Sequence, residues 1–313
     1  MICIDEIQRK PGLFSIIRSI VDEWGENGKF LVLGSASRDL LKQSAESLAG
    51  RISYNKLGPF LYSEVYKKVS LERYIERGGF PKSLLAEDTG VSIKWREDFI
   101  ITFLERDLML WAGFSPETMR RMWKMLAHVN GQTVNFSMFG KSLGVSNVTV
   151  HNYIDLLQGT YMLEVLPPYI SNAGKRLVKA PKVYVADSGI TTVLLGLRDF
   201  SDISAHPALG SIWEQIVLTN LKGHFPYASF YYYRTSAGAE VDLVMEVQNK
   251  VFVIVCKSSV APTLSKGNYF AIEDINPIHT FIVCPAKKGW PMKKGIDVIT
   301  ITELYKKIIE KFK

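Results

Sequence analysis

The start of the chain constrains its fold more than any other feature. A short apolar run, Ile2–Ile4, ends in Asp5 and Glu6, and a segment with apolar residues at helical spacing separates it from a second apolar run, Phe30–Leu33. Short apolar runs of this kind are typical of strands that are buried on both faces of a parallel sheet. The order strand, helix, strand therefore predicts a parallel α/β unit whose first strand delivers two carboxylates at its carboxyl end.

Polar residues follow both of these predicted strands. Asp5 and Glu6 end the first strand, and Gly34-Ser35-Ala36-Ser37 ends the second. In enzymes that transfer phosphoryl groups, one carboxylate holds Mg²⁺ and a second can polarise the attacking water. A hydroxyl on the neighbouring strand, here that of Ser35, would face the γ-phosphate. The pattern therefore predicts part of a nucleotide site, although solvated acids at a strand end are the alternative.

Further short motifs follow in a fixed order, Leu48-Ala49-Gly50-Arg51, Leu57-Gly58-Pro59-Phe60 and Gly78-Gly79-Phe80-Pro81. The whole order resembles a family of AAA-type ATPases found across bacteria and archaea, and the resemblance continues through that family's C-terminal domain of unknown function. It implies that intact members bind ATP and Mg²⁺, with Asp5 as the Mg²⁺ ligand. It also implies that Arg51 senses or transmits the phosphate state; a surface arginine that pairs with an acid is the alternative.

The phosphate-binding loop of such ATPases is absent from these 313 residues, because no segment fits the pattern GxxxxGK followed by Ser or Thr. The amides and the lysine of that loop supply most phosphate contacts, so Asp5 and Glu6 are half of a site. Met1 also occupies a position that should lie inside a strand. We therefore expect a mis-assigned start, a split gene or a truncated fragment, and we expect this chain alone neither to bind ATP appreciably nor to hydrolyse it.

Residues 115–186 predict three helices followed by a two-stranded wing. Ser115-Pro116-Glu117 is a typical helix start, and Gly144 ends a short second helix just before Ser146 begins the third. This order is typical of a winged helix, a fold that binds DNA in some proteins and protein partners in others.

Outward-facing residues of the third helix and basic residues of the wing are the expected nucleic-acid contacts. Asn and Thr can contact base edges or phosphates, and Lys and Arg can contact the backbone. The expected contacts are Asn147, Thr149, Asn152, Lys175 and Arg176, with Lys179 and Lys182 near the wing. The formal net charge of +7 favours an acidic partner. Asp155 would repel phosphate, so duplex DNA and a protein partner stay open as alternatives.

The last third of the chain shows a third pattern, a helix followed by strands with polar ends. Glu214 lies on the predicted helix, Asp242 on the second strand, and Lys257 after the third. An acid, an Asp and an E-x-K motif on adjacent strands are typical of restriction-endonuclease-like folds, where the carboxylates bind Mg²⁺ and the lysine stabilises the attacking water or the phosphate.

One ligand of this nuclease motif is missing from the sequence. The acid two positions before the lysine should be residue 255, which is Val255, and valine cannot ligate a hard cation. Because Glu214 and Glu240 are near Asp242 in the pattern, residual metal binding at Asp242 is the alternative. We expect a fold retained for docking or DNA contact that does not cleave.

Together these patterns predict an α/β chain of four parts. They are a truncated AAA-type P-loop NTPase sheet (1–66), a helical lid or linker (67–114), a winged helix-turn-helix (115–190) and a restriction-endonuclease-like α/β domain (191–313). The function expected is that of the C-terminal portion of an AAA-type ATP-binding protein associated with DNA. The alternatives are a metal-dependent nuclease and a non-enzymatic DNA- or protein-binding module, and assembly into oligomers is open.

Cysteine usage and hydropathy indicate where the chain works. It has three cysteines far apart in sequence, no signal peptide at its start, and no apolar stretch of membrane-spanning length. These features predict a cytoplasmic protein without membrane contact.

Overall fold

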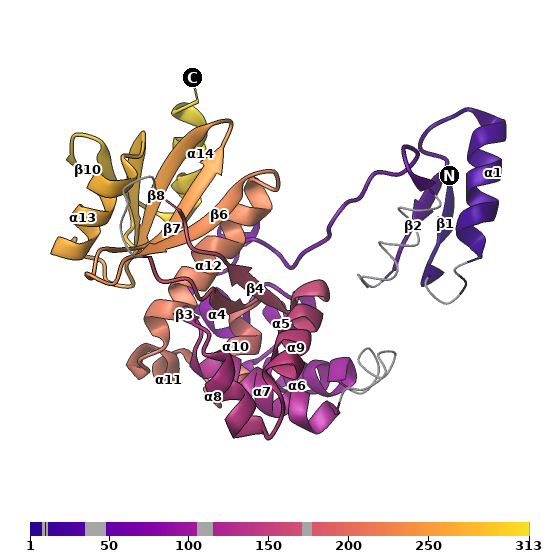
Figure 1. The fold of residues 1–313 in the computed structure, drawn as a ribbon, viewed down its shortest axis with the longest axis horizontal. Helices are drawn as coiled ribbons and strands as arrows, with labels where there is room; N and C mark the ends of the chain where they lie inside the picture. The colour runs from indigo at the N-terminus through magenta and orange to yellow at the C-terminus, as the bar shows by residue number, and fades with distance from the viewer. Residues whose placement is uncertain (8–9, 11, 35–47, 105–114, 171–176, 313) are drawn as a thin grey trace. The chain divides into compact units, whose positions relative to one another are not determined.

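The computed structural model describes residues 1–7, 10, 12–34, 48–104, 115–170 and 177–312 (Figure 1). Its helices and sheets form a mixed α/β structure, as the sequence predicts, and the described strands make sheets of two, three and six strands. The chain divides into two units, residues 1–57 with 154–162, and residues 58–153 with 163–313. None of the described helices is both long and apolar enough to cross a membrane.

The first unit begins with the strand, helix and strand that the apolar runs predict. These are β1 (Ile2–Ile4), α1 (Leu13–Trp24) and β2 (Phe30–Val32), and the two strands pair in parallel. Helix α1 buries Phe14 and Ile17 in a small apolar core. The carboxyl end of β1 therefore carries Asp5 and Glu6 next in sequence, as expected.

In the described part of residues 48–104, four helices follow. They are α3 (Tyr62–Val65), α4 (Leu71–Arg77), α5 (Pro81–Leu84) and α6 (Thr89–Thr102). Capping side chains begin two of them, because the Ser70 hydroxyl accepts from the Arg73 amide at 3.2 Å and an Asp88 carboxylate oxygen accepts from the Val91 amide at 2.8 Å. The described part of residues 67–114 is therefore mostly helical, as the sequence predicts for this segment.

The Gly78-Gly79-Phe80-Pro81 motif forms a close crossing with the start of α10 (Ser188–Leu194). Gly78 has a φ of +72°, and a Cβ atom there would lie 2.0 Å from Asp187 Oδ1. The Gly79 amide donates to Asp187 Oδ2 at 2.7 Å. Glycine is required because the backbone passes directly over a buried carboxylate, so this motif has a packing role in the fold.

The middle of the chain alternates helices with short strands. The elements are α7 (Pro116–His128), β3 (Gln132–Thr133), α8 (Phe136–Leu143), α9 (Asn147–Gly159), β4 (Leu163–Leu166) and β5 (Lys182–Val185). The three strands form an antiparallel sheet in the order β3-β5-β4. Gly144 ends α8 in the left-handed conformation, with φ of +69°.

The six-stranded sheet fills the last third of the chain, after α10 and α11 (Phe200–Ala205). Its elements are α12 (Leu209–His224), β6 (Ser229–Arg234), β7 (Glu240–Val247), β8 (Lys250–Cys256), α13 (Lys266–Ile275), β9 (His279–Val283), β10 (Trp290–Lys293), β11 (Ile296–Ile299) and α14 (Ile301–Glu310). The strand order is β10-β11-β9-β8-β7-β6, and β8, β9 and β11 run parallel to one another. Helices α12 and α14 contribute to the core on one face, and α13 to the core on the other.

The pairing of β6 with β7 contains a bulge. Tyr231 pairs with Val244 and Tyr233 pairs with Val241, so Asp242 and Leu243 together oppose the one residue Tyr232. A bulge of this kind re-aims a side chain and is often found next to functional sites. Here Asp242 is one of the two residues in the bulge.

The loop between β4 and β5 is joined to the edge of the six-stranded sheet. Isolated bridges pair Pro168 with Tyr232 and Leu177 with Thr235. The Tyr232 hydroxyl also donates to the Val178 carbonyl at 3.1 Å. Both ends of this loop therefore lie along β6, and the edge strand is partly covered.

A candidate acidic site with a buried lysine

An acidic site forms where β5 of the three-stranded sheet meets α12 and β7. Lys182 comes from β5, Glu214 from α12, and Glu240 and Asp242 from β7. The Lys182 ammonium lies 3.4 Å from Glu240 Oε1 and 3.9 Å from Glu214 Oε2, and its side chain is 3% exposed. The structure therefore brings Glu214 and Asp242 together, as the nuclease pattern predicts, and adds a cation between the sheets.

Each carboxylate is held by a specific donor. Asp242 Oδ2 accepts from the Cys256 amide at 2.7 Å, and Glu214 Oε2 accepts from the Tyr184 hydroxyl at 3.0 Å. Glu240 Oε2 lies 3.6 Å from Arg234 Nε at the more exposed side of the site. These contacts fix the side chains that surround Lys182.

Burial controls the charge of the site. Burial and, after it, the nearby Asp242 charge raise the pKa of Glu214 to about 8, while Lys182 opposes the shift. Burial also raises the pKa of Asp242, against the effect of Lys182. Burial disfavours the Lys182 ammonium itself, but the carboxylates Glu214, Asp242 and Glu240 outweigh that effect and raise its pKa. At neutral pH the site therefore keeps an ammonium and a protonated Glu214.

The residues present do not fit a divalent cation. Carboxylate oxygens are the ligands that Mg²⁺ and Mn²⁺ favour, but the ammonium of Lys182 lies among them. Over the described part of the chain, no three His, Cys, Asp or Glu residues are arranged to hold a metal ion. The arrangement is that of an internal ion pair, neutralised from within the chain.

The expected place of the missing acid requires a correction. Val255 is fully buried in the apolar core that includes α13, on the opposite face from α12. The β8 residue beside the carboxylates is Cys256, whose pKa is raised by burial and then by the charges of Asp242 and Glu214. Lys257 lies near enough that its charge opposes the rise in the pKa of Asp242 that burial causes.

Lys182 is the residue of this site that the sequence placed elsewhere. It was expected near a solvent-exposed wing, yet it is buried because β5 lies between β3 and β4 and points this side chain toward α12. Tyr184, which contacts Glu214, was missed altogether. The available signal was their spacing, since residues two apart on a strand share a face.

The predicted ATPase residues lie in the first unit. Asp5 is exposed, and its Oδ1 accepts from the Glu6 amide at 2.9 Å; Glu6 itself has a φ of +52°. Ser35 lies outside the described residues. Arg51 donates to both carboxylate oxygens of Asp22, with 3.1 Å between Nη2 and Oδ2, and so takes the alternative role of a surface arginine that pairs with an acid.

The side chains predicted to contact nucleic acid differ in whether they form hydrogen bonds within the chain. The Asn147 amide donates to the Ser137 hydroxyl at 3.5 Å, and the Thr149 hydroxyl bonds that of Ser146 at 2.9 Å. The side chain of Asn152 is exposed and has no hydrogen bond to any described residue. Lys175 and Arg176 lie outside the described residues.

Comparison with known protein families divides the chain into three matched segments. Residues 1–66 match an AAA domain, residues 68–201 match a domain of unknown function (DUF8612), and residues 209–304 match another domain of unknown function (DUF4143). A solved structure, protein VC1899 from Vibrio cholerae, covers 97% of this chain and 81% of its own at 11% identity and a TM-score of 0.25, which is too low to inform the fold.

Three full-length relatives share sequence with most of the chain. Uncharacterized protein Rv2008c of Mycobacterium tuberculosis and uncharacterized protein Mb2031c of Mycobacterium bovis are each 35% identical over 305 residues, which is 97% of this chain and 69% of theirs. Uncharacterized protein MJ1544 of Methanocaldococcus jannaschii is 22% identical over 80% of this chain and 60% of its own length. The chain therefore belongs to the family of the mycobacterial proteins Rv2008c and Mb2031c, and it joins an AAA domain to two domains of unknown function.

Proposed function

We propose that this chain is a DNA-binding part of an AAA-type ATP-binding protein and that its endonuclease-like site does not cleave DNA. In this proposal a winged helix within residues 115–186 contacts the duplex. The single observation that carries it is the arrangement of α7, β3, α8, α9, β4 and β5, with the strands in the order β3-β5-β4. A helix after a tight glycine turn, backed by a small antiparallel sheet, is how winged helices present a recognition helix.

The surface around the start of α9 supports a nucleic-acid partner. The outward residues Asn147, Val148, His151 and Asn152 are exposed, and Asn152 can bond a base edge. Arg121 on α7 is also exposed and donates to the Ser142 carbonyl at 3.0 Å, next to the turn that precedes α9.

Other cations lie on the same helices. Arg120 and Lys124 on α7 and Lys141 on α8 are exposed. Cations on helices that flank a recognition helix contact phosphates and add affinity without sequence preference. We therefore expect the binding to fall steeply as salt is raised.

The ATP-related part of the proposal rests on the AAA domain at residues 1–66. Intact proteins with such domains use ATP and Mg²⁺, and Asp5 and Glu6 supply oxygen ligands of the class that Mg²⁺ takes. The 313 residues contain no Walker A pattern for the phosphates. We therefore propose that a polypeptide of these residues does not hydrolyse ATP by itself.

Binding of duplex DNA is tested by fluorescence anisotropy at two salt concentrations. We expect the full chain to bind a labelled duplex, and the double substitution Asn152→Ala with Arg121→Glu to weaken binding by about tenfold or more. Lys266→Glu, an exposed lysine on α13, is the matched control for the charge change and should have a smaller effect. The proposal fails if no duplex binds at low salt, or if both variants bind like the wild type.

Metal-dependent DNA cleavage is the second candidate, and the pairing of Glu214 with Asp242 in one site favours it. The buried Lys182 opposes it, because an ammonium takes the space in which a metal ion would bind the carboxylates. Incubation of purified protein with plasmid and Mn²⁺ tests it directly. We expect no nicking, and nicking that disappears in Asp242→Ala would establish the nuclease instead.

A further inference from the structure

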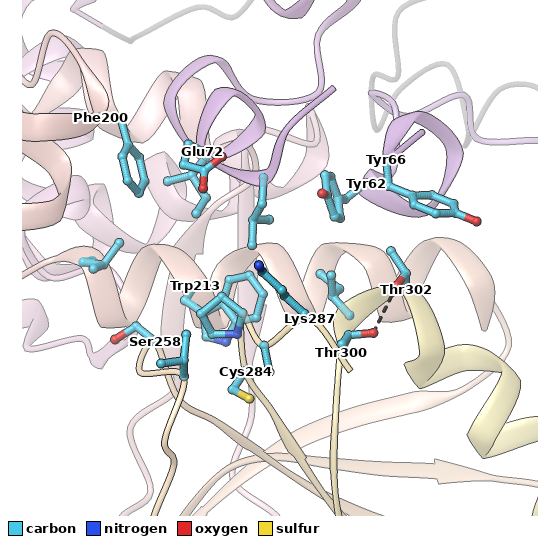
Figure 2. Close-up of a pocket in the computed structure, with 17 residues that line it drawn as sticks. Tyr62, Tyr66, Glu72, Phe200, Trp213, Ser258, Cys284, Lys287, Thr300 and Thr302 are labelled. Carbon is cyan, nitrogen blue, oxygen red and sulfur yellow. Dashed lines mark hydrogen bonds between the residues drawn. The ribbon is translucent and has the colours of Figure 1, made fainter. Parts of the chain in front are cut away.

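A pocket lies at the carboxyl ends of the three parallel strands of the six-stranded sheet. Its volume is about 500 Å³, and its lower wall is made by the segments that follow β8, β9 and β11 (Figure 2). These segments contribute Ser258, Cys284, Lys287 and Thr302. The opposite wall comes from the helices that precede the sheet, α3, α4 and α11.

The topology explains why the sheet opens at this point. The helix after β8, α13, packs in the core on one face, whereas the helix after β11, α14, packs in the core on the other. The chain therefore leaves β8 and β11, the two strands that flank β9, toward opposite faces of the sheet. In open α/β sheets, ligands bind in the crevice that such a divergence creates outside the carboxyl ends of the strands.

The walls combine aromatic rings with two opposite charges. The aromatic lining residues are Tyr62, Tyr66, Phe200 and Trp213. Figure 2 shows the Lys287 amine pointing into the space between Trp213 and the helix that carries Glu72. Neither the Lys287 nor the Glu72 side chain forms a hydrogen bond or an ion pair with a described residue.

We propose that this pocket binds a nucleoside monophosphate. Aromatic side chains stack on a nucleobase, a carboxylate accepts from its N–H groups, and a lysine with nearby hydroxyls binds phosphate. Glu72, Lys287 and the Thr302 hydroxyl supply these polar groups, and the volume lies in the usual range for small-ligand sites. One lysine matches one phosphate group better than the charge of a triphosphate. The pocket lies in the second unit, so this inference goes beyond the proposed function and does not depend on it.

Calorimetric titration of the full chain with AMP tests the assignment. We expect a dissociation constant below about 1 mM for the wild type. Lys287→Ala should bind AMP about tenfold more weakly, because a charge-assisted hydrogen bond to phosphate is lost. Lys288→Ala is the matched control, since Lys288 is also exposed but does not line the pocket, and it should bind AMP like the wild type. Glu72→Gln should weaken AMP binding less than Lys287→Ala does.

Two further ligands separate the base from the phosphate. Adenosine should bind the wild type about as weakly as AMP binds Lys287→Ala, and inorganic phosphate should bind more weakly than AMP. Thermal unfolding of each variant checks that these exposed substitutions leave the fold intact. The proposal is overturned if AMP does not bind, or if Lys287→Ala and Lys288→Ala bind AMP equally well. Loss of DNA binding in the separate anisotropy experiment would leave this result unchanged.

Discussion

Two pairs of carboxylates in this chain differ in how far water reaches them. Asp5 and Glu6 follow β1 in the first unit, where Asp5 is exposed and accepts a hydrogen bond from the neighbouring Glu6 amide. Glu214 and Asp242 lie in the second unit, where burial raises the pKa of both. The difference shows that an acid at a strand end has no fixed role, because its solvation decides whether it stays charged.

Solvation also decides where the compensating cation comes from. An exposed carboxylate keeps its charge in water and can take a metal ion from solution. A buried carboxylate needs a partner within the fold, and here Lys182 supplies it from a different sheet. The half-buried Glu214 and Asp242 are therefore part of the structure that holds the three-stranded and six-stranded sheets together, whereas the exposed Asp5 can be changed without affecting the core.

The largest effect should follow from Lys182→Met, which keeps the length of the side chain and removes its charge. It leaves Glu240 and its neighbours without their buried cation, and breaking a buried ion pair costs about 3–5 kcal/mol. The measurement is the free energy of unfolding in urea at neutral pH. Lys179→Met is the matched control, because Lys179 is exposed and three positions away, and it should cost less than about 0.5 kcal/mol. Equal stabilities of the two variants would contradict the role given to Lys182.

A smaller effect, with a definite sign, should appear in the pH dependence of stability. The pKa of Glu214 is about 8 in the folded chain against 4.5 in the reference state, so the folded state binds the extra proton between these values. Stability contributed by this proton is complete below about pH 4.5 and is lost as the pH rises through 8, by at most about 1.4 kcal/mol per pH unit.

Glu214→Gln isolates that contribution, because the amide oxygen can still accept from the Tyr184 hydroxyl and does not titrate. Urea unfolding at several pH values should give a flatter profile for the variant than for the wild type. Part of the slope should persist, since the pKa of Asp242 is raised as well. Burial lowers the pKa of His224 and of His279, which makes stability rise with pH. Both histidines are present in the wild type and in the variant, so their contribution cancels when the two profiles are compared. Identical profiles would mean that Glu214 is ionised in the folded chain.

The sequence predicted the elements of this fold better than the site between them. The apolar run of β8 indicates its burial correctly, whereas β1 is found at Ile2–Ile4 with Ile2 and Cys3 exposed and not buried on both faces. Helix α13 was missed because it buries few apolar residues and exposes Tyr269 and Phe270. The charge partners of Lys182 come from distant parts of the chain, and no local pattern records such a meeting.

The bulge in β7 explains why Cys256, and not Val255, lies beside Asp242 on β8. Leu243 pairs with Ile254, so a regular continuation of β7 would place Asp242 opposite Val255 and on the same face of the sheet. Because Asp242 and Leu243 together oppose Tyr232, the face of Asp242 changes, and Cys256 becomes its neighbour on β8. An insertion of one residue in the pairing leaves no distinct mark in the sequence, so the neighbour of Asp242 on β8 could not be predicted.

The smallest effect should come from the exposed Asp5, and it tests whether a solvated carboxylate contributes little to the stability of the fold. Asp5→Asn removes one charge at the end of β1 but keeps an oxygen that can accept from the Glu6 amide. Because water solvates this carboxylate already, we expect the free energy of unfolding to change by less than about 0.5 kcal/mol. Urea unfolding followed by circular dichroism measures it beside Lys182→Met under the same conditions. A loss in the free energy of unfolding as large as that of Lys182→Met would show that Asp5 also has a structural partner. The contrast between the solvated Asp5 and the carboxylates around Lys182 would then be wrong.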